Sequence, residues 1–341
     1  MRMKKIIIFS LLAVIIACNN NTENKNQEMA YKSIGSIERF DPALDNIVSS
    51  NAKIEIIADG FDWSEGPLWI ENHKMLLFSD IPPNTIYKWT EEKGKEVYLT
   101  PSGYTDTLKR GGEIGSNGLI LDKAENLVMC QHGDRRMAKM DATLDKPAPK
   151  FITLADKYNG KRFSSPNDAV YNSSGELFFT DPPYGLETQD DKDPKKELSF
   201  NGVYKVKTNG EVILLVDSIT RPNGLAFLPG EKKLIIACSD PAKPFWYIYD
   251  VNGDSLINGK IFYNATEEAK TMTGLPDGLK IDKNGNVFAT GPGGVNIFTS
   301  EGKKLGLIKF SDPTSNCTFS ADEKTLYVTN DMNLVRIKLR D

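Results

Sequence analysis

Six oxygen-bearing side chains recur along this sequence, and each opens an apolar stretch. They are separated by 52, 50, 56, 54 and 39 residues, and a small residue usually follows. The set consists of Glu65, Asn117, Asn167, Asn223, Asp277 and Asn316. Carboxylate and amide oxygens, with no thiolate or imidazole among them, suit Ca²⁺, Mg²⁺ or Mn²⁺. One Asn-Gly or Asp-Gly pair is a common turn, but six aligned copies predict a shared cation site.

The elements that must position these side chains are short strands. After each member of the set comes an apolar run, a turn and a second strand, as in residues 279–281 and 286–290. A repeat of about 40–50 residues with strands in every unit is typical of a propeller. The sequence therefore predicts an all-β fold, a six-bladed β-propeller with a central metal site. We expect the strand at 53–58 to pair with the last blade and close the ring. Asn316 lacks a following glycine, and for this residue we favour a turn or packing role.

The N-terminus has the pattern of a secretion signal. An apolar run at 6–17 is too short to span a bilayer, and Cys18 follows it. This end resembles the lipobox of bacterial lipoproteins, which implies a lipid on Cys18; the alternative is an ordinary signal peptide. We predict a signal peptide at 1–18, a flexible tether at 19–50 and the propeller at 51–341. The protein would then be anchored to a membrane of the bacterial cell envelope, facing the periplasm or the cell surface.

Composition limits the partners. The 341 residues are 40% hydrophobic and 26% charged, with a net charge of −4. No basic stripe stands out, so we expect no nucleic-acid partner, and we expect a monomer. Three further cysteines, Cys130, Cys238 and Cys317, lie in different repeats. We interpret them as small buried residues and not as disulfide partners or zinc ligands.

Several motifs carry a family resemblance that extends over residues 54–339. They are Ser64–Pro67, Ser165–Asp168, Arg221–Gly224 and Leu275–Gly278, together with Cys130–Arg136 and Phe179–Gly185. The sequence resembles the SMP-30/gluconolactonase/luciferin-regenerating-enzyme (regucalcin-like) family, and the last two stretches resemble its bacterial gluconolactonase branch. The resemblance implies a six-bladed propeller with one axial divalent cation that hydrolyses sugar lactones or, in relatives, other esters.

The resemblance also assigns residues. The family's metal ligands match Glu65, Asn167, Asn223 and Asp277. Ca²⁺ is favoured as the one divalent cation, with Mg²⁺, Mn²⁺ and Zn²⁺ as alternatives. Asn117 matches a pocket asparagine of the bacterial branch, expected to contact substrate or a metal-bound water. Ser165 stands where the regucalcin branch has an arginine, so sugar recognition by that arginine does not transfer.

For the chemistry we expect the cation to polarise a lactone carbonyl, with Asp277 as ligand and general base. A carboxylate on a cation is a weaker base, so His132 is a second catalytic candidate; its alternative is a structural hydrogen-bonding role. Other candidates for the substrate-binding mouth are Asp168, Asp181 and Tyr184. The charged insertion at 187–197 would form either a flap over the site or a solvated loop.

Two further functions stay open at this point. The same site could serve an arylesterase or phosphotriesterase-like hydrolase acting on another ester. The protein could also be a lipid-anchored, metal-containing propeller that binds a ligand and catalyses nothing, because a propeller fold alone does not decide function. Turnover separates a binding protein from an enzyme, and a comparison of sugar lactones with other esters as substrates separates the two hydrolases.

Overall fold

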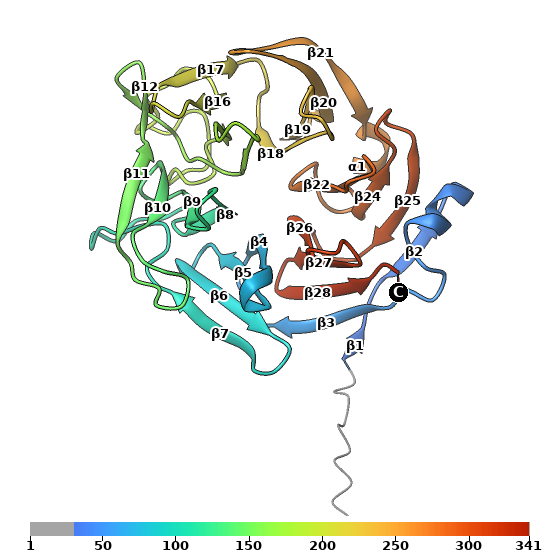
Figure 1. The fold of residues 1–341 in the computed structure, drawn as a ribbon. Coiled ribbons are helices and arrows are strands. Elements are labelled where there is room, and N and C mark those ends of the chain that lie inside the picture. Colours follow the sequence, from blue (N-terminus) through green and yellow to red (C-terminus); the bar gives the residue numbers. More distant parts are fainter. Residues whose placement is uncertain (1–30, 341) are drawn as a thin grey trace, which may run out of the picture. The chain divides into compact units, whose positions relative to one another are not determined.

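The computed structural model describes residues 31–340, which form six antiparallel sheets arranged as blades around one axis (Figure 1). A separate two-stranded sheet consists of β12 (Lys157–Tyr158) and β13 (Lys161–Arg162). The inner-to-outer strands of blades one to three are β4–β7 (Ser64–Ile70, Met75–Asp80, Thr85–Thr90, Gly94–Leu99), β8–β11 (Ser116–Leu121, Leu127–Gln131, Arg136–Met140, Phe151–Ala155) and β14–β17 (Ala169–Tyr171, Leu177–Asp181, Gly202–Val206, Val212–Val216). Blade four consists of β18–β21 (Pro222–Phe227, Lys233–Asp240, Lys243–Asn252, Ser255–Asn264), and blade five of β22–β25 (Leu279–Ile281, Val287–Gly291, Gly294–Phe298, Lys304–Lys309). The prediction of an all-β, six-bladed propeller is confirmed.

The sixth blade closes the ring with a strand from the start of the chain. Its inner strands are β26–β28 (Asn316–Phe319, Thr325–Asn330, Asn333–Lys338), and β3 (Ile54–Asp59) pairs with β28. The predicted closure is therefore confirmed. It satisfies backbone groups that an open array would expose at its edge.

The tether predicted at 19–50 is too long. Within it β1 (Lys32–Ser33) pairs with β3, and β2 (Ser36–Arg39) adds a fifth strand to blade five beside β25. A 3-10 helix, Pro42–Asn46, follows and buries Leu44 completely. A polar composition had suggested an unpaired chain, but backbone pairing to an existing sheet edge needs few apolar side chains. The predicted signal peptide, Cys18 and residues 19–30 lie outside the described residues.

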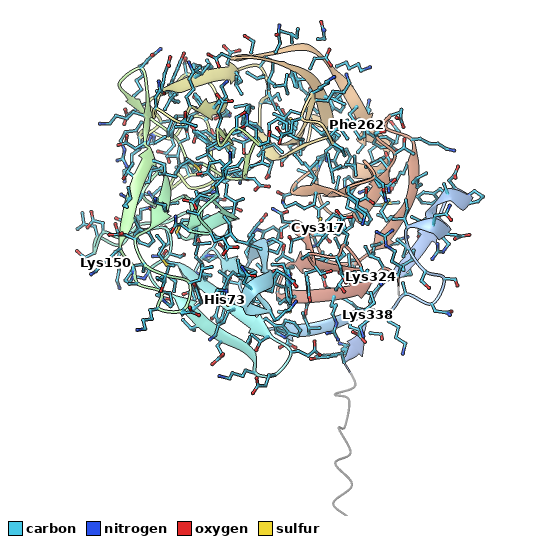
Figure 2. All side chains as sticks on the ribbon, viewed as in Figure 1. His73, Lys150, Phe262, Cys317, Lys324 and Lys338 are labelled. Atoms are coloured by element: carbon cyan, nitrogen blue, oxygen red, sulfur yellow. The ribbon has the colours of Figure 1, made fainter. Side chains whose placement is uncertain are left out.

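Packing between neighbouring blades forms the core. Apolar faces of adjacent sheets meet, as where Leu77 of β5 packs in one cluster with Met129 of β9. Burying a side chain of this size contributes about 1.5–3 kcal/mol. The three cysteines in the described chain are free and buried, as predicted, and Cys317 lies near the axis in Figure 2. The helices are short: besides the 3-10 helix Pro42–Asn46, the described chain has α1 (Thr266–Ala269) and a 3-10 turn at Glu71–His73. Within residues 31–340 no helix is long and apolar enough to cross a membrane.

The glycines that follow the axial residues serve close approach between blades. Hairpin glycines such as Gly210 have φ near +87°, as the predicted turns require. Gly118 and Gly224 instead lie inside strands. A Cβ on Gly118 would stand 2.9 Å from the Asn167 carbonyl oxygen, and one on Gly224 would stand 2.4 Å from the Asp277 carbonyl oxygen. The Asn-Gly pattern therefore lets inner strands of adjacent blades approach, which a larger residue would prevent.

Candidate active site at the propeller axis

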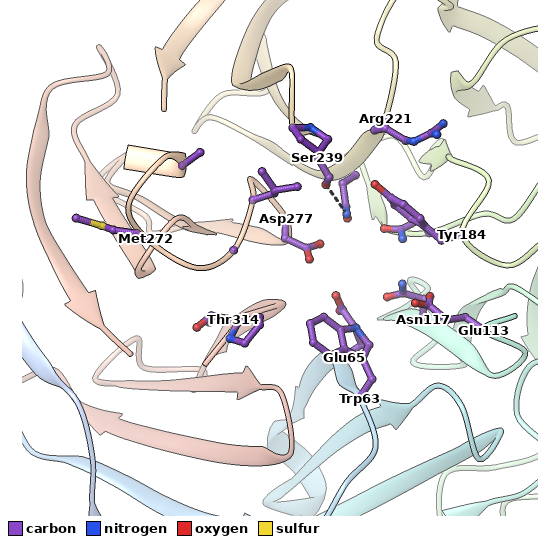
Figure 3. A pocket seen from close by; sticks show the side chains of 17 residues that line it. Trp63, Glu65, Glu113, Asn117, Tyr184, Arg221, Ser239, Met272, Asp277 and Thr314 are labelled. Carbon is purple, nitrogen blue, oxygen red and sulfur yellow. Dashed lines mark hydrogen bonds between the residues drawn. The ribbon is translucent and has the colours of Figure 1, made fainter. Parts of the chain in front are cut away.

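One end of the axis opens into a cavity of about 590 Å³. Five of the predicted side chains line it, one from each of the first five blades: Glu65, Asn117, Asn167, Asn223 and Asp277. In the view of Figure 3, Glu65 points into the cavity from below and Asp277 from the left, and Asn117 and Tyr184 project from the right. The volume lies within the range of small-molecule sites. The structure thus brings these residues together, while their role as cation ligands stays a prediction.

Two of the lining carboxyls are held in a strongly unfavourable setting for negative charge. Burial, with repulsion from Asp168, raises the pKa of Glu65 to about 8, although its Oε2 accepts a 2.6 Å hydrogen bond from the Gly66 amide. Burial and repulsion from Glu65 raise the pKa of Asp277 well above its ordinary value. Neither forms an ion pair with a lysine or arginine of residues 31–340. A cation at this place would relieve both effects.

Two side-chain oxygens at the cavity, one of them in the Asp277 carboxyl group, lack a hydrogen-bond partner in the described chain. Oδ1 of Asp277 and Oδ1 of Asn117 are buried without a hydrogen bond in the described chain. The Asn223 amide nitrogen donates to Ser239 Oγ at 2.8 Å, and Ser239 in turn donates to the Pro276 carbonyl at 2.6 Å. This chain joins blades four and five at the cavity and fixes the orientation of the Asn223 amide.

Asn316 has a larger role than the turn or packing residue expected from the sequence. Its Nδ2 lies 3.3 Å from Glu65 Oε2 and 3.3 Å from Asp168 Oδ2, so one amide group donates to two carboxyls. Its Oδ1 accepts from the Cys317 amide at 2.9 Å. Asn316 and Asp168 do not line the cavity. They form a layer beneath Glu65 on the axis.

Of the four remaining candidates, only Tyr184 lines the cavity. Asp168 lies in the deeper layer just described. Asp181 is fully buried and accepts hydrogen bonds from the Ser164 and Ser165 amides at 2.9 and 2.6 Å. Burial raises its pKa to about 6. Asp181 therefore braces the turn that leads to Asn167, and the expectation that Asp168 and Asp181 form the mouth is not met.

His132 is also absent from the cavity wall. Its ring is fully buried, its two nitrogens have no hydrogen-bond partner in the described chain, and Nδ1 lies 3.5 Å from Glu113 Oε2. Glu113 does line the cavity. The imidazole that the sequence offered as a direct catalyst is thus separated from substrate space by a carboxylate that the sequence did not single out.

Several residues of the cavity wall occupy the same position relative to an axial residue in their repeat. Side chains alternate along a strand, so a residue two positions before an axial one faces the same side, one layer higher. Four such residues line the cavity: Trp63, Arg221, Leu275 and Thr314. Arg221 is held by Asp191 of the charged insertion, and the insertion itself contributes no lining residue. It is a rim loop and not a flap over the site.

Comparisons with known proteins agree with this architecture. Residues 63–331 match the model of the SMP-30/Gluconolactonase/LRE-like region. The chain is 39% identical over 315 residues to a gluconolactonase from Zymomonas mobilis subsp. mobilis, covering 90% of this chain and 87% of that one. The solved structure of a gluconolactonase from Xanthomonas campestris superposes with a TM-score of 0.77 at 28% identity, covering 91% and 98%. A calcium-binding regucalcin from Agrobacterium tumefaciens shares the fold, with a TM-score of 0.63 at 15% identity over 92% and 98%. The chain therefore belongs to the SMP-30/gluconolactonase/LRE-like family.

Proposed function

We propose that this protein hydrolyses a sugar lactone, adding water to the ring ester and releasing the open-chain hydroxy acid. Three observations support the proposal: membership in the family, 39% identity to a gluconolactonase over 90% of the chain, and a cavity lined by carboxyl and amide groups. Of these, the observation that carries most weight is the pair of buried, unneutralised carboxyls facing one cavity. A stable scaffold gains nothing from such a pair, so its chemistry must be used by a ligand.

The residues present fit a divalent cation. Asp277 Oδ1 and Asn117 Oδ1 are buried without partners beside Glu65, whose ionisation burial opposes. Among residues 31–340 no group of three His, Cys, Asp or Glu side chains could hold a metal, so amide oxygens must complete the set. We assign the ligands to Glu65, Asn167, Asn223 and Asp277. This all-oxygen set favours Ca²⁺, with Mg²⁺, Mn²⁺ and Zn²⁺ as competitors in a test; a relative with this fold is described as calcium-binding.

When bound, the cation would supply Lewis acidity toward the lactone carbonyl. The residues of this chain do the rest. Asn117 and Tyr184 present polar groups toward sugar hydroxyls, whereas Trp63, Met272 and Leu275 offer apolar surface that excludes water from the ring face. Ser239 holds the Asn223 amide in place through its 2.8 Å hydrogen bond.

Two carboxylates at the cavity could take the proton from the attacking water. Asp277 is one, as the sequence suggested, but coordination to a cation lowers its basicity. Glu113 is the other, and it is not among the assigned ligands. His132 cannot receive that proton directly, because its ring does not reach the cavity.

The cellular setting is part of the proposal. A lipid on Cys18 would hold the propeller on a membrane of the bacterial envelope, facing the periplasm or the exterior, as a monomer without a nucleic-acid partner. The motif at Cys18 and the net charge of −4 support this placement. Incorporation of a labelled fatty acid by the wild type, lost in Cys18→Ser, tests it.

The activity test uses protein lacking residues 1–18 and glucono-1,5-lactone, corrected for spontaneous ring opening. Chelation should abolish turnover, and one of Ca²⁺, Mg²⁺, Mn²⁺ or Zn²⁺ should restore it. Asp277→Asn and Glu65→Gln should each lose at least about 100-fold in kcat together with cation affinity. Turnover of aryl esters or phosphotriesters alone would replace the lactone with another ester. Tight cation binding without any turnover would make the protein a binding propeller.

A further inference from the structure

Glu113 is an acidic side chain of the cavity that no repeat motif positions. It lies on the loop between β7 and β8, four residues before Asn117, and its side chain is 26% exposed. Across the cavity, Glu113 is near enough to raise the pKa values of both Glu65 and Asp277. In the described part of the chain no lysine or arginine pairs with it, and the basic side chain within 4 Å of its carboxyl group is that of His132.

The loop that carries Glu113 is fastened on both sides of that residue. The His132 amide donates to the Gly115 carbonyl at 3.2 Å, and the Gly133 amide donates to the Ile114 carbonyl at 3.2 Å. Arg110, three residues earlier, donates to the carbonyls of Gly133 and Gly185. These contacts hold the backbone on both sides of Glu113 in place without any ligand, which favours a preorganised position for its carboxyl group.

His132 stands behind the Glu113 carboxylate. The ring is completely buried between this loop and the turn at 182–185, where a Cβ on Gly185 would come within 2.6 Å of His132 Cβ. Neither ring nitrogen forms a hydrogen bond in the described chain, but Nδ1 lies 3.5 Å from Glu113 Oε2, and Glu113 is the one carboxylate within 4 Å of the ring nitrogens among residues 31–340. A buried imidazole packed behind a carboxylate on a cavity wall limits the orientations that the carboxylate can adopt.

We propose that Glu113 is the catalytic proton acceptor for lactone opening and that His132 is its positioning residue. This inference rests on the proposed hydrolase function. Glu113 takes a proton from water as the water oxygen bonds to the lactone carbonyl carbon and the carbonyl electron pair moves to its oxygen. The tetrahedral species then collapses, the bond from carbon to ring oxygen breaks, and the Glu113 carboxylic acid returns the proton to that oxygen. The hydroxy-acid product ionises to solvent, and Glu113 is again a carboxylate.

Different carboxyl groups of the cavity would bind the cation and accept the proton, because a carboxylate that coordinates a cation is a weaker base. Glu65 and Asp277 face the cavity axis with amide oxygens around them, whereas Glu113 has only an imidazole beside it. The other ionisable groups that line the cavity are Arg221, which is paired with Asp191, and Tyr184, whose pKa burial raises. Glu113 is therefore the lining carboxyl group that is not occupied by the assigned cation site and faces the substrate space.

The experiment compares Glu113→Gln with Glu187→Gln, a carboxylate on the same rim that pairs with Lys195 outside the cavity. Both variants are made in protein lacking residues 1–18. Glu113→Gln should lower kcat on glucono-1,5-lactone by about 100-fold or more. Its KM and its Ca²⁺ affinity by calorimetry should stay within about twofold of wild type, and Glu187→Gln should match wild type throughout. By contrast, Asp277→Asn should lose Ca²⁺ affinity as well.

Two further variants keep the test sharp. Glu113→Ala should regain turnover with added formate, which can occupy the vacated volume and accept a proton, and Glu113→Gln should not. His132→Gln should move the acidic limb of the kcat–pH profile with a smaller loss, about 10-fold, because it acts only through Glu113. Glu113→Gln that retains more than a third of wild-type kcat would overturn the inference and return the proton to Asp277. Wild type without lactone turnover would instead overturn the proposed function and this inference with it.

Discussion

Without a bound cation, the folded protein should lose stability progressively as the pH rises from about 5 to 8. Burial, with repulsion from Asp168, raises the pKa of Glu65 from 4.5 to about 8. Over this window the folded chain holds a proton that the unfolded chain has lost. Stability increases with pH only where the unfolded chain binds more protons, so here the free energy of unfolding must decrease. Asp277, whose pKa is also raised, contributes with the same sign.

The size of the effect follows from the Glu65 carboxyl. One pKa unit corresponds to about 1.4 kcal/mol, so raising the pH from 5 to 7 should remove on the order of 3 kcal/mol from the free energy of unfolding. With an unfolding entropy of about 2.1 cal/mol/K per residue over roughly 310 residues, the midpoint should fall by about 4 °C. Excess Ca²⁺ should cancel this dependence, since it binds the ionised carboxylates of the folded chain only.

Scanning calorimetry between pH 5 and 8, in chelator and in excess Ca²⁺, measures the effect. The difference between wild type and Glu65→Gln isolates this carboxyl from every other titrating group. Glu211→Gln is the matched control, because Glu211 pairs with Lys207 at the surface and does not line the cavity. A chelated wild type whose midpoint changes with pH just as that of Glu65→Gln does would refute the reasoning.

Three further outcomes are expected. Asn316→Ala removes the amide shared by Glu65 and Asp168 and should cost about 1–3 kcal/mol in urea unfolding, with weaker cation binding by calorimetry; an unchanged unfolding curve would contradict the bridging role. Gly224→Ala should reduce the yield of folded protein, seen by circular dichroism, because its Cβ would stand 2.4 Å from the Asp277 carbonyl oxygen; normal folding would show that the blades can separate. The three buried cysteines should resist a thiol reagent in the native protein and react after unfolding, and fast native labelling of any of them would argue against its burial; they are Cys130, Cys238 and Cys317.

The axial site could be predicted because a repeat makes distant residues equivalent. Once one inner strand faces the channel, the residue that opens each other inner strand must face it too, which places Glu65 and Asp277 in one cavity although 212 residues separate them. The period of two along a strand extends this logic by one layer, to Trp63 and Arg221. The same repeat therefore also determines this second layer of the cavity wall.

Loops obey no such period, and there the predictions failed. Glu113 reaches the cavity only because its loop is fixed by backbone contacts to residues 132–134, which no spacing in the sequence reveals. The sequence offered His132 as a second catalytic candidate, but its ring is fully buried behind Glu113. Asp181 was expected at the mouth, but two backbone amides turn its carboxyl inward.

The layer beneath the cavity explains how this fold tolerates so much acid at its centre. Glu65 and Asp168 would repel each other across the axis, and the single amide of Asn316 donates to both. Because each bond is long, at 3.3 Å, the amide offsets only part of that repulsion. Burial, together with the remaining repulsion from Asp168, raises the pKa of Glu65 to about 8. Asn316 thus stabilises the acidic centre of the fold while the pKa of Glu65 stays raised, which a fully hydrogen-bonded network would not allow.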